Sequence, residues 1–311
     1  MMGVRAIGRD QRRVLYAAVA AVLLFVVGQV VRPGFASGQG IESVLVVASF
    51  VGFVAAGQMF VILVGGIDLS VPWVLNAAAI LLVTSTGGAD SRLALGLAVT
   101  LGMGALVGAV SGVGVALFGV PAVVMTLAMN GIMEGLTLGL SSGMTCGACA
   151  AYAPPLIQDA VHGHLLGVPA VLYVWLLVIL VLSFALAFTV FGRATYAVGN
   201  SARVSYLAGI RVGVVTVALY ALSGVFSALA GIMLVGFGGQ AALGMGDPYL
   251  FQSIAAVVIG GVYILGGRGS YVGVVAGAVT LVALVSVLLA LNMPDYGRSI
   301  VYGVIILVLL L

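Results

Sequence analysis

The sequence predicts an all-α, polytopic membrane protein with about ten transmembrane helices. Hydrophobic residues make up 63% of the 311 positions and charged residues only 6%, against about 25% charged residues in a typical soluble domain. The mean hydropathy of +1.34 leaves too much apolar surface for a water-soluble fold to bury. The 46 glycines are typical of membrane helices, whose backbones approach closely at small residues. We therefore expect a single transmembrane domain over residues 1–311.

A helix needs about 20 mostly apolar residues to cross a bilayer, and ten apolar runs approach that length. The first run is too long for the core of a signal peptide, so we expect an uncleaved helix. The third is short enough to be a half-helix, and the connection 118–121 is very short. Because the last run reaches Leu311, a short native extension stays open. The runs are 14–31, 42–63, 70–86, 93–118, 120–140, 168–190, 211–236, 248–265, 270–291 and 297–311.

Arginine positions orient these spans. All 11 basic residues are Arg, and cytoplasmic loops of membrane proteins carry the excess of basic residues. With the N-terminus inside, eight Arg are cytoplasmic and three are outside. The inside residues are Arg5, Arg9, Arg12, Arg13, Arg193, Arg203, Arg211 and Arg268, and the outside residues are Arg32, Arg92 and Arg298. We therefore expect both termini in the cytoplasm, a cytoplasmic segment 1–13, an outside loop 141–167 and a cytoplasmic loop 191–210.

The sequence contains no lysine, which limits the chemistry of the chain. A P-loop needs a Lys to reach nucleotide phosphates, so ATP-driven work would require ATP and Mg²⁺ on a separate subunit. We expect no cofactor, no metal ion and no enzymatic activity on this chain. The net charge of only +3 indicates no nucleic-acid-binding surface, and no H-E-x-x-H metalloprotease motif is present.

Two carboxylates stand out, Asp68 between the second and third predicted spans and Glu134 inside the fifth. Charge at membrane depth is costly and indicates function by default. Asp68 follows Gly65 and Gly66 and precedes Ser70 and Pro72. This pattern predicts a helix that breaks and restarts near residue 70, with Asp68 or Ser70 accepting from freed N–H groups. Asp68 is then either a helix cap at the cytoplasmic interface or a direct participant in solute passage or gating, because non-helical backbone at membrane depth must be buried or line water.

Glu134 lies in the middle of the fifth span, with Asn130 four residues earlier on the same helix face. These two residues, and Asn76 in the third span, either form structural bonds between helices or line a solute path. Our candidates for the path or its gate are Asp68, Ser70, Asn76, Asn130 and Glu134.

The outside loop holds both cysteines and both histidines. Cys146 and Cys149 are two residues apart, and His162 and His164 follow. Two free thiols and a disulfide formed in an oxidising compartment both stay open. A zinc site is a weaker alternative, because the H-x-H spacing is unlike that of common structural sites.

The cytoplasmic loop predicts one short helix over residues 201–208. Asn200 or Ser201 would be its N-cap and Gly209 its C′ residue. Its apolar side either docks into a groove of a soluble partner or lies on lipid headgroups. That side consists of Val204, Leu207 and Ala208.

Four segments carry a resemblance to a known family. They are GGIDLSV at 65–71, FGVPAVVMTL at 118–127, the stretch 199–210 that begins GNSARVS, and the stretch 259–270 that begins IGG and ends GGRGS. In this order, and over most of the chain, they resemble the permease subunits of bacterial ABC importers of the ribose, galactoside and xylose class. This class lies within the branched-chain amino acid/ribose permease superfamily.

The resemblance implies a type II-like permease of the bacterial inner (plasma) membrane that imports a sugar or sugar-like solute by alternating access. It implies cytoplasmic ABC ATPase subunits, a periplasmic or lipid-anchored solute-binding protein, and a second permease chain that is a copy or a paralogue. Membrane lipid would surround the permease chains. The loop that couples to the ATPase would be the cytoplasmic one, with candidates Arg193, Gly199, Asn200, Arg203, Leu207 and Gly209.

Three features depart from the family pattern and leave the solute and the choice between homodimer and heterodimer open. Pro72 stands where Gly is usual, Glu134 stands where Arg is common, and the loop with Cys146 and Cys149 is unusual. An ion-coupled secondary transporter that uses Asp68 or Glu134 is the main alternative. A small-solute channel is less favoured, and a membrane enzyme least, because no nucleophile–base or metal constellation is present.

Overall fold

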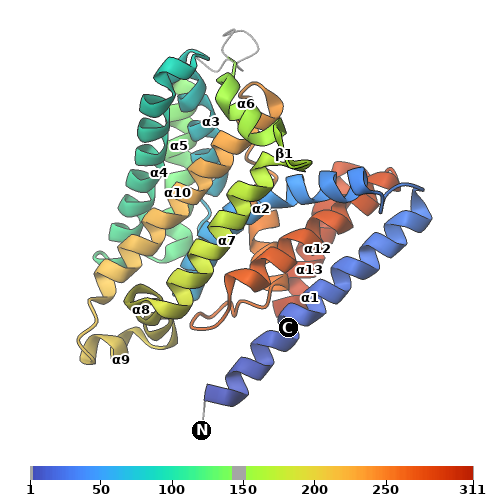
Figure 1. Ribbon diagram of the computed structural model, residues 1–311. Coiled ribbons are helices and arrows are strands. Elements are labelled where there is room, and N and C mark those ends of the chain that lie inside the picture. The colour runs from blue at the N-terminus through green and yellow to red at the C-terminus, as the bar shows by residue number, and fades with distance from the viewer. Residues whose placement is uncertain (1–2, 142–151, 311) are drawn as a thin grey trace.

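The computed structural model describes residues 3–141 and 152–310, which form a bundle of helices with one short hairpin (Figure 1). The hairpin strands β1 (His164–Leu165) and β2 (Val168–Pro169) pair antiparallel, with His164 opposite Pro169. The prediction of an all-α membrane protein is therefore confirmed. The helices are α1 (Gly3–Val31), α2 (Gly38–Leu63), α3 (Val71–Thr86), the 3₁₀ turn η1 (Asp90–Arg92), α4 (Leu93–Ala116), α5 (Ala122–Leu140), α6 (Pro155–His162), α7 (Ala170–Phe188), α8 (Val190–Asn200), α9 (Ala202–Leu207), α10 (Val212–Gly238), α11 (Tyr249–Ile259), α12 (Tyr271–Ala290) and α13 (Asp295–Leu310).

Each of the ten predicted spans contains a helix, but three of these helices are short. Within the described residues, seven helices are long and apolar enough to cross a membrane alone, namely α1, α2, α4, α5, α7, α10 and α12. At 1.5 Å per residue, α3 is about 24 Å long and α11 about 17 Å, against a hydrocarbon core of about 30 Å. The predicted span 248–265 is wrong in its second part, because the helix ends at Ile259 and glycine-rich turns follow.

The centre of the bundle is formed by α2 and α10. Every residue of α2 from Ala48 to Leu63 is buried, as expected of a helix that is apolar all round. α10 packs against α2, α3 and α4. A Cβ at Gly104 or Gly108 of α4 would lie 2.4 Å or 2.1 Å from backbone carbonyl oxygens of α10, so glycine brings these two backbones together.

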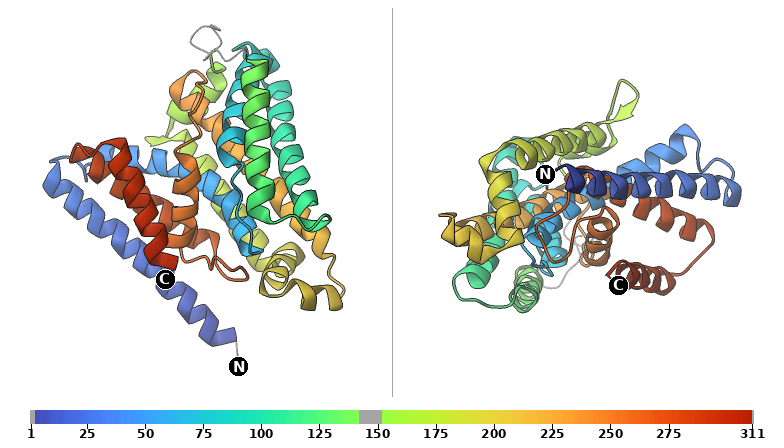
Figure 2. Two further views of the ribbon diagram at one scale, coloured as in Figure 1. Left: turned by 180° about the vertical axis from the view of Figure 1, so that it is seen from behind. Right: turned by 90° about the horizontal axis from the view of Figure 1, so that it is seen from below.

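The two ends of the bundle carry different short elements. α8 and α9 lie at one end, and α6 and the hairpin lie at the other (Figures 1 and 2). Both chain ends are on the side of α8 and α9 (Figure 2), as the predicted alternation of spans requires. α1 is one continuous helix from Gly3 through the first predicted span, and the cytoplasmic placement of segment 1–13 stays a prediction. The side of the membrane that each end faces stays a prediction.

The predicted cytoplasmic loop 191–210 is largely helical. α9 confirms the expected short helix, and Ser201 is its N-cap, with the hydroxyl oxygen accepting from Val204 N at 3.3 Å. Gly209 follows with φ +83°, as expected of a C′ residue. The loop prediction missed α8, which starts after Thr189, whose side chain caps Gly192 N.

Candidate functional site

The chain leaves helical geometry between α2 and α3, over residues 64–70, which we call the 64–70 break. Gly65 adopts φ +79°, a conformation that favours glycine. α3 restarts at Val71 with Ser70 as its N-cap residue and Pro72 in its first turn, where proline is tolerated. The predicted break with a restart near residue 70 is confirmed.

Asp68 holds this break together from inside the bundle. The residue is 1% exposed. Its Oδ1 accepts from the backbone N of Ser70 at 2.9 Å and from Ser70 Oγ at 2.6 Å, and its Oδ2 accepts from Ser223 Oγ at 2.6 Å. A buried carboxyl group is thus matched by three donors, as burial requires. Ser223 is well inside α10, so Asp68 lies beside the interior of that helix. The choice between a cap at the cytoplasmic interface and a role in solute passage stays a prediction. Ser70 makes no capping bond with its own side chain.

The backbone around Asp68 is paired with side chains as well. The Gln58 amide, in the orientation that satisfies both of its partners, donates to Asp68 O at 3.0 Å and accepts from Asp68 N at 3.3 Å. A Cβ on Gly66 would lie 2.4 Å from the Tyr220 hydroxyl oxygen, so glycine leaves room for that ring. The Tyr220 hydroxyl is buried with no hydrogen-bond partner among the described residues.

α5 is joined to the break by one threonine. Thr126 Oγ1 accepts from Leu69 N at 3.0 Å and lies 3.2 Å from Ile67 O and 2.9 Å from Ala122 O, either of which its hydrogen can reach. Thr126 is fully buried. The segment 118–127 therefore contacts the segment 65–71 directly.

The turn 260–270, which we call the glycine turn, closes on the end of α2. Gly267 N donates to Leu63 O at 2.8 Å. Four of its glycines have positive φ, which ordinary side chains rarely adopt; they are Gly261, Gly266, Gly267 and Gly269.

The end of α8 completes the arrangement. Asn200 Nδ2 donates to Gly267 O at 3.2 Å, and the Tyr196 hydroxyl donates to Gly269 O at 2.8 Å. A Cβ on Gly199 would lie 1.8 Å from Leu63 O. All four segments that carry the family resemblance therefore meet, and we call the 64–70 break, the glycine turn and the end of α8 together the junction.

A second polar group lies along α3 and α5. Asn76 is fully buried, and its Oδ1 accepts from Gly246 N at 3.2 Å. Asn76 Nδ2 and Asn130 Oδ1 are buried atoms without partners in the described part of the chain. Glu134 is half-buried one turn after Asn130. Such unpaired atoms call for water or a bound solute.

Asp247 joins this group, although no local sequence pattern indicates it. The residue lies in the connection between α10 and α11. Burial and the nearby charge of Glu134 raise the pKa of Asp247. Glu134 and Asp247 are far apart in sequence. Glu134 lies on a helix and Asp247 in a connection, so no local pattern could predict that they lie near each other.

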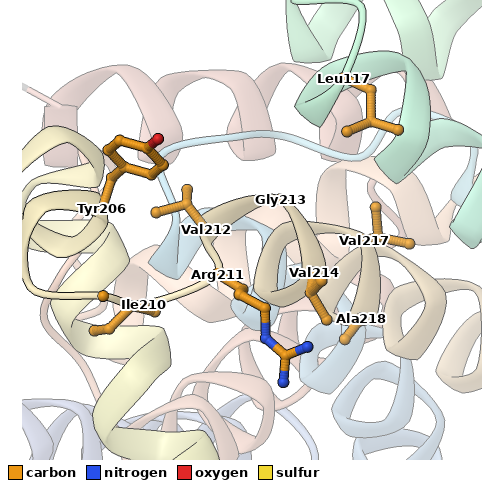
Figure 3. A pocket seen from close by; sticks show the side chains of 10 residues that line it. Leu117, Tyr206, Ile210, Arg211, Val212, Gly213, Val214, Val217 and Ala218 are labelled. Atoms are coloured by element: carbon orange, nitrogen blue, oxygen red, sulfur yellow. The ribbon is translucent and has the colours of Figure 1, made fainter.

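α9 presents its apolar side chains outward. Val204 is 64% and Leu207 77% exposed, while Ser205 is buried. Arg203 is exposed, and Arg193 reaches the carbonyl oxygen of Phe188 at 3.5 Å. Beside α9 an apolar pocket of about 770 Å³ opens between the start of α10 and the end of α4 (Figure 3). Residues on its walls include Leu117, Tyr206, Ile210, Val214 and Val217.

The two histidines of the predicted outside loop contact different partners. His162 Nε2 is 3.0 Å from Phe237 O, and the ring stacks on Phe237. His164 Nε2 is 3.1 Å from Glu42 Oε1. No group of three His, Cys, Asp or Glu within the described residues could hold a metal ion. Cys146 and Cys149 lie outside the described residues, so the disulfide stays a prediction.

Comparison with known proteins adds a family and several relatives. The family model described as branched-chain amino acid transport system / permease component matches residues 40–310. The ribose import permease protein of Haemophilus influenzae is 32% identical over 293 residues, which is 94% of this chain and 90% of that protein. The autoinducer 2 import system permease protein of Escherichia coli is 31% identical over 301 residues, covering 97% and 86%. No solved structure gives a significant match to this chain.

Proposed function

Because this chain belongs to the branched-chain amino acid transport system / permease component family, we propose that it is the permease subunit of an ATP-driven, binding-protein-dependent importer. The family resemblance predicted from the sequence is confirmed. We propose a sugar or sugar-like molecule as the solute, which the relatives named for ribose import and for autoinducer 2 import support.

The junction carries the mechanistic part of the proposal. α9 is exposed, capped and apolar on its outer side, and the end of α8 that precedes it contacts both Leu63 and Gly267. Displacement of α9 by a partner would therefore act directly on the 64–70 break. The break is bonded in turn to α10 through Ser223 and to α5 through Thr126.

In this proposal two permease chains alternate between inward- and outward-open arrangements. ATPase subunits press on α8 and α9 from the cytoplasm, and a solute-binding protein delivers solute on the other side. Arg193, Gly199, Asn200, Arg203, Leu207 and Gly209 form the coupling elements at the ATPase side. The chain itself does no covalent chemistry.

The two polar groups have separate roles in the proposal. Asp68 and Ser70 are hydrogen-bonded within the protein, so their role is to hold the shape of the 64–70 break. Asn76 and Asn130 have unpaired buried atoms, so together with Glu134 and the nearby Asp247 they contact the solute. Few polar contacts suit a transporter, because a tight site would slow release.

Copurification tests the partner assignment, and variants of α9 test its coupling to ATP hydrolysis. The chain should copurify with an ATPase subunit. Arg203→Glu, or deletion of residues 201–208, should uncouple ATP hydrolysis from uptake while the chain still inserts in the membrane. Arg92→Glu, a matched charge reversal in η1, should leave coupling intact. Normal transport by the deletion variant would refute the role of α9.

A further inference from the structure

A pocket of about 580 Å³ lies where α1 turns into α2, at the end of α1 away from the N-terminus (Figure 1). Its walls are the turn 32–37, the first turns of α2 and the last turn of α12. The volume falls within the range of about 300–1,000 Å³ that small-molecule sites occupy. Neither the junction nor the polar group beside α5 contributes to it.

The turn that forms one wall is held in place by its own contacts. Phe35 is buried, its ring lies 5.7 Å from that of Phe25, and a Cβ on Gly28 would lie 2.4 Å from it. Ala36 N donates to Gln29 Oε1 at 2.9 Å. The pocket is therefore preformed, which lowers the entropic cost of binding.

Arg32 is the charged residue of the lining, and no acidic residue accompanies it. No ion pair involves Arg32 in the described chain. Ser37 accepts from Gly40 N at 3.2 Å, which leaves its hydroxyl hydrogen free to donate. Ser286 adds a second hydroxyl from α12. Such a set of donors around a cation matches a phosphate oxygen group.

The position of the pocket at the end of an apolar span and its apolar walls both indicate that its ligand is a lipid. Arg32 directly follows the apolar stretch Val14–Val31, which is long enough to span the hydrocarbon core, so its guanidinium lies at the membrane interface. Val44, Val47 and Leu289 belong to the apolar part of the lining. A free anion would use the cation and the hydroxyls but gain nothing from these side chains.

We propose that this pocket binds the phosphodiester headgroup of a membrane phospholipid. Arg32 pairs with the phosphate, Ser37 and Ser286 donate to its oxygens, and the start of the acyl chains covers Val44 and Leu289. α1 packs mainly on α12, so the bound lipid links the turn between α1 and α2 to the end of α12.

Short-chain phosphatidylglycerol is the probe for this site. Binding to the purified full chain in detergent is measured by thermal shift and by native mass spectrometry. Arg32→Gln should weaken binding about tenfold, as expected for the loss of one charge-assisted hydrogen bond. Arg92→Gln removes a charge from the same end of the bundle outside the pocket and should bind like wild type.

A second variant keeps the test decisive if Arg32→Gln fails to fold. Ser286→Leu fills the pocket and leaves Arg32 in place, so it should also lose the lipid. Unchanged binding by either variant would overturn the proposal. An equal thermal shift with inorganic phosphate would make the pocket a free-anion site, and an equal shift with dioctanoylglycerol would make it an acyl-chain groove, so either result would overturn it too.

Discussion

Replacing Gly199 by alanine should force α8 away from the two segments that it contacts in the junction. The new Cβ would lie 1.8 Å from Leu63 O and 2.6 Å from Gly267 N. Both are backbone atoms, and they are hydrogen-bonded to each other at 2.8 Å, so neither can rotate aside. Relief to an ordinary 3.4 Å contact requires a shift on the order of 1.5 Å at the end of α8.

The destabilisation caused by Gly199→Ala exceeds the stabilisation from the higher helix propensity of alanine. Overpacking costs about 1–3 kcal/mol, and loss of the bond from Asn200 to Gly267 adds about 0.5–1.5 kcal/mol. Alanine in place of glycine in a helix recovers about 1 kcal/mol. The net penalty, on the order of 2 kcal/mol, disfavours the contact between α8 and the break by more than tenfold.

Solute uptake and solute-stimulated ATP hydrolysis by the reconstituted transporter measure the effect. For Gly199→Ala we expect uptake to fall tenfold or more, while ATP hydrolysis loses its response to solute. Gly213→Ala is the matched control, because its Cβ would meet only Leu117 Cδ2, at 3.7 Å. If the two variants transported solute equally, the junction would not transmit movement from α8.

Three further perturbations test single contacts. Ser223→Ala removes a donor to Asp68 and should destabilise the protein by about 1–3 kcal/mol; an unchanged melting temperature would contradict this. Ser201→Ala removes the cap of α9, costs about 0.5–2 kcal/mol and should speed amide exchange there, whereas Ser201→Asp should preserve protection; equal exchange in both variants would exclude the cap. Glu134→Gln should lower the pKa of Asp247 toward its ordinary value, followed by carboxyl NMR, and an unmoved titration would show that the two charges do not interact. Because the raised pKa favours the protonated form in the folded state, the contribution of Asp247 to stability is present at low pH and lost as pH rises through the folded pKa, and Glu134→Gln should reduce this loss.

Local signals explain what could be predicted from the sequence. The glycine pair before Asp68 and the proline after Ser70 indicated the 64–70 break, and Ser201 with Gly209 bracketed α9. Each of these signals acts within a few residues, on backbone conformation or on a cap, so one sequence is enough to detect it.

Long-range contacts explain what could not be predicted. The bond from Ser223 to Asp68 joins residues 155 positions apart, and no periodicity relates them. α8 was missed because Gly192 and Gly199 weaken a helix in isolation, yet close approach to α7 and to the junction requires glycine there. The end of α11 at Ile259 was missed because the glycine turn is apolar enough to resemble a span.

Uptake into proteoliposomes tests the central claim most directly. The purified complex would be supplied with ATP, the binding protein and labelled sugar, while ionophores collapse the proton and sodium gradients. The account predicts that uptake continues under these conditions and stops when ATP is withdrawn. Uptake that follows the ion gradient and ignores ATP would contradict it and would instead favour a secondary transporter that uses Asp68 or Glu134.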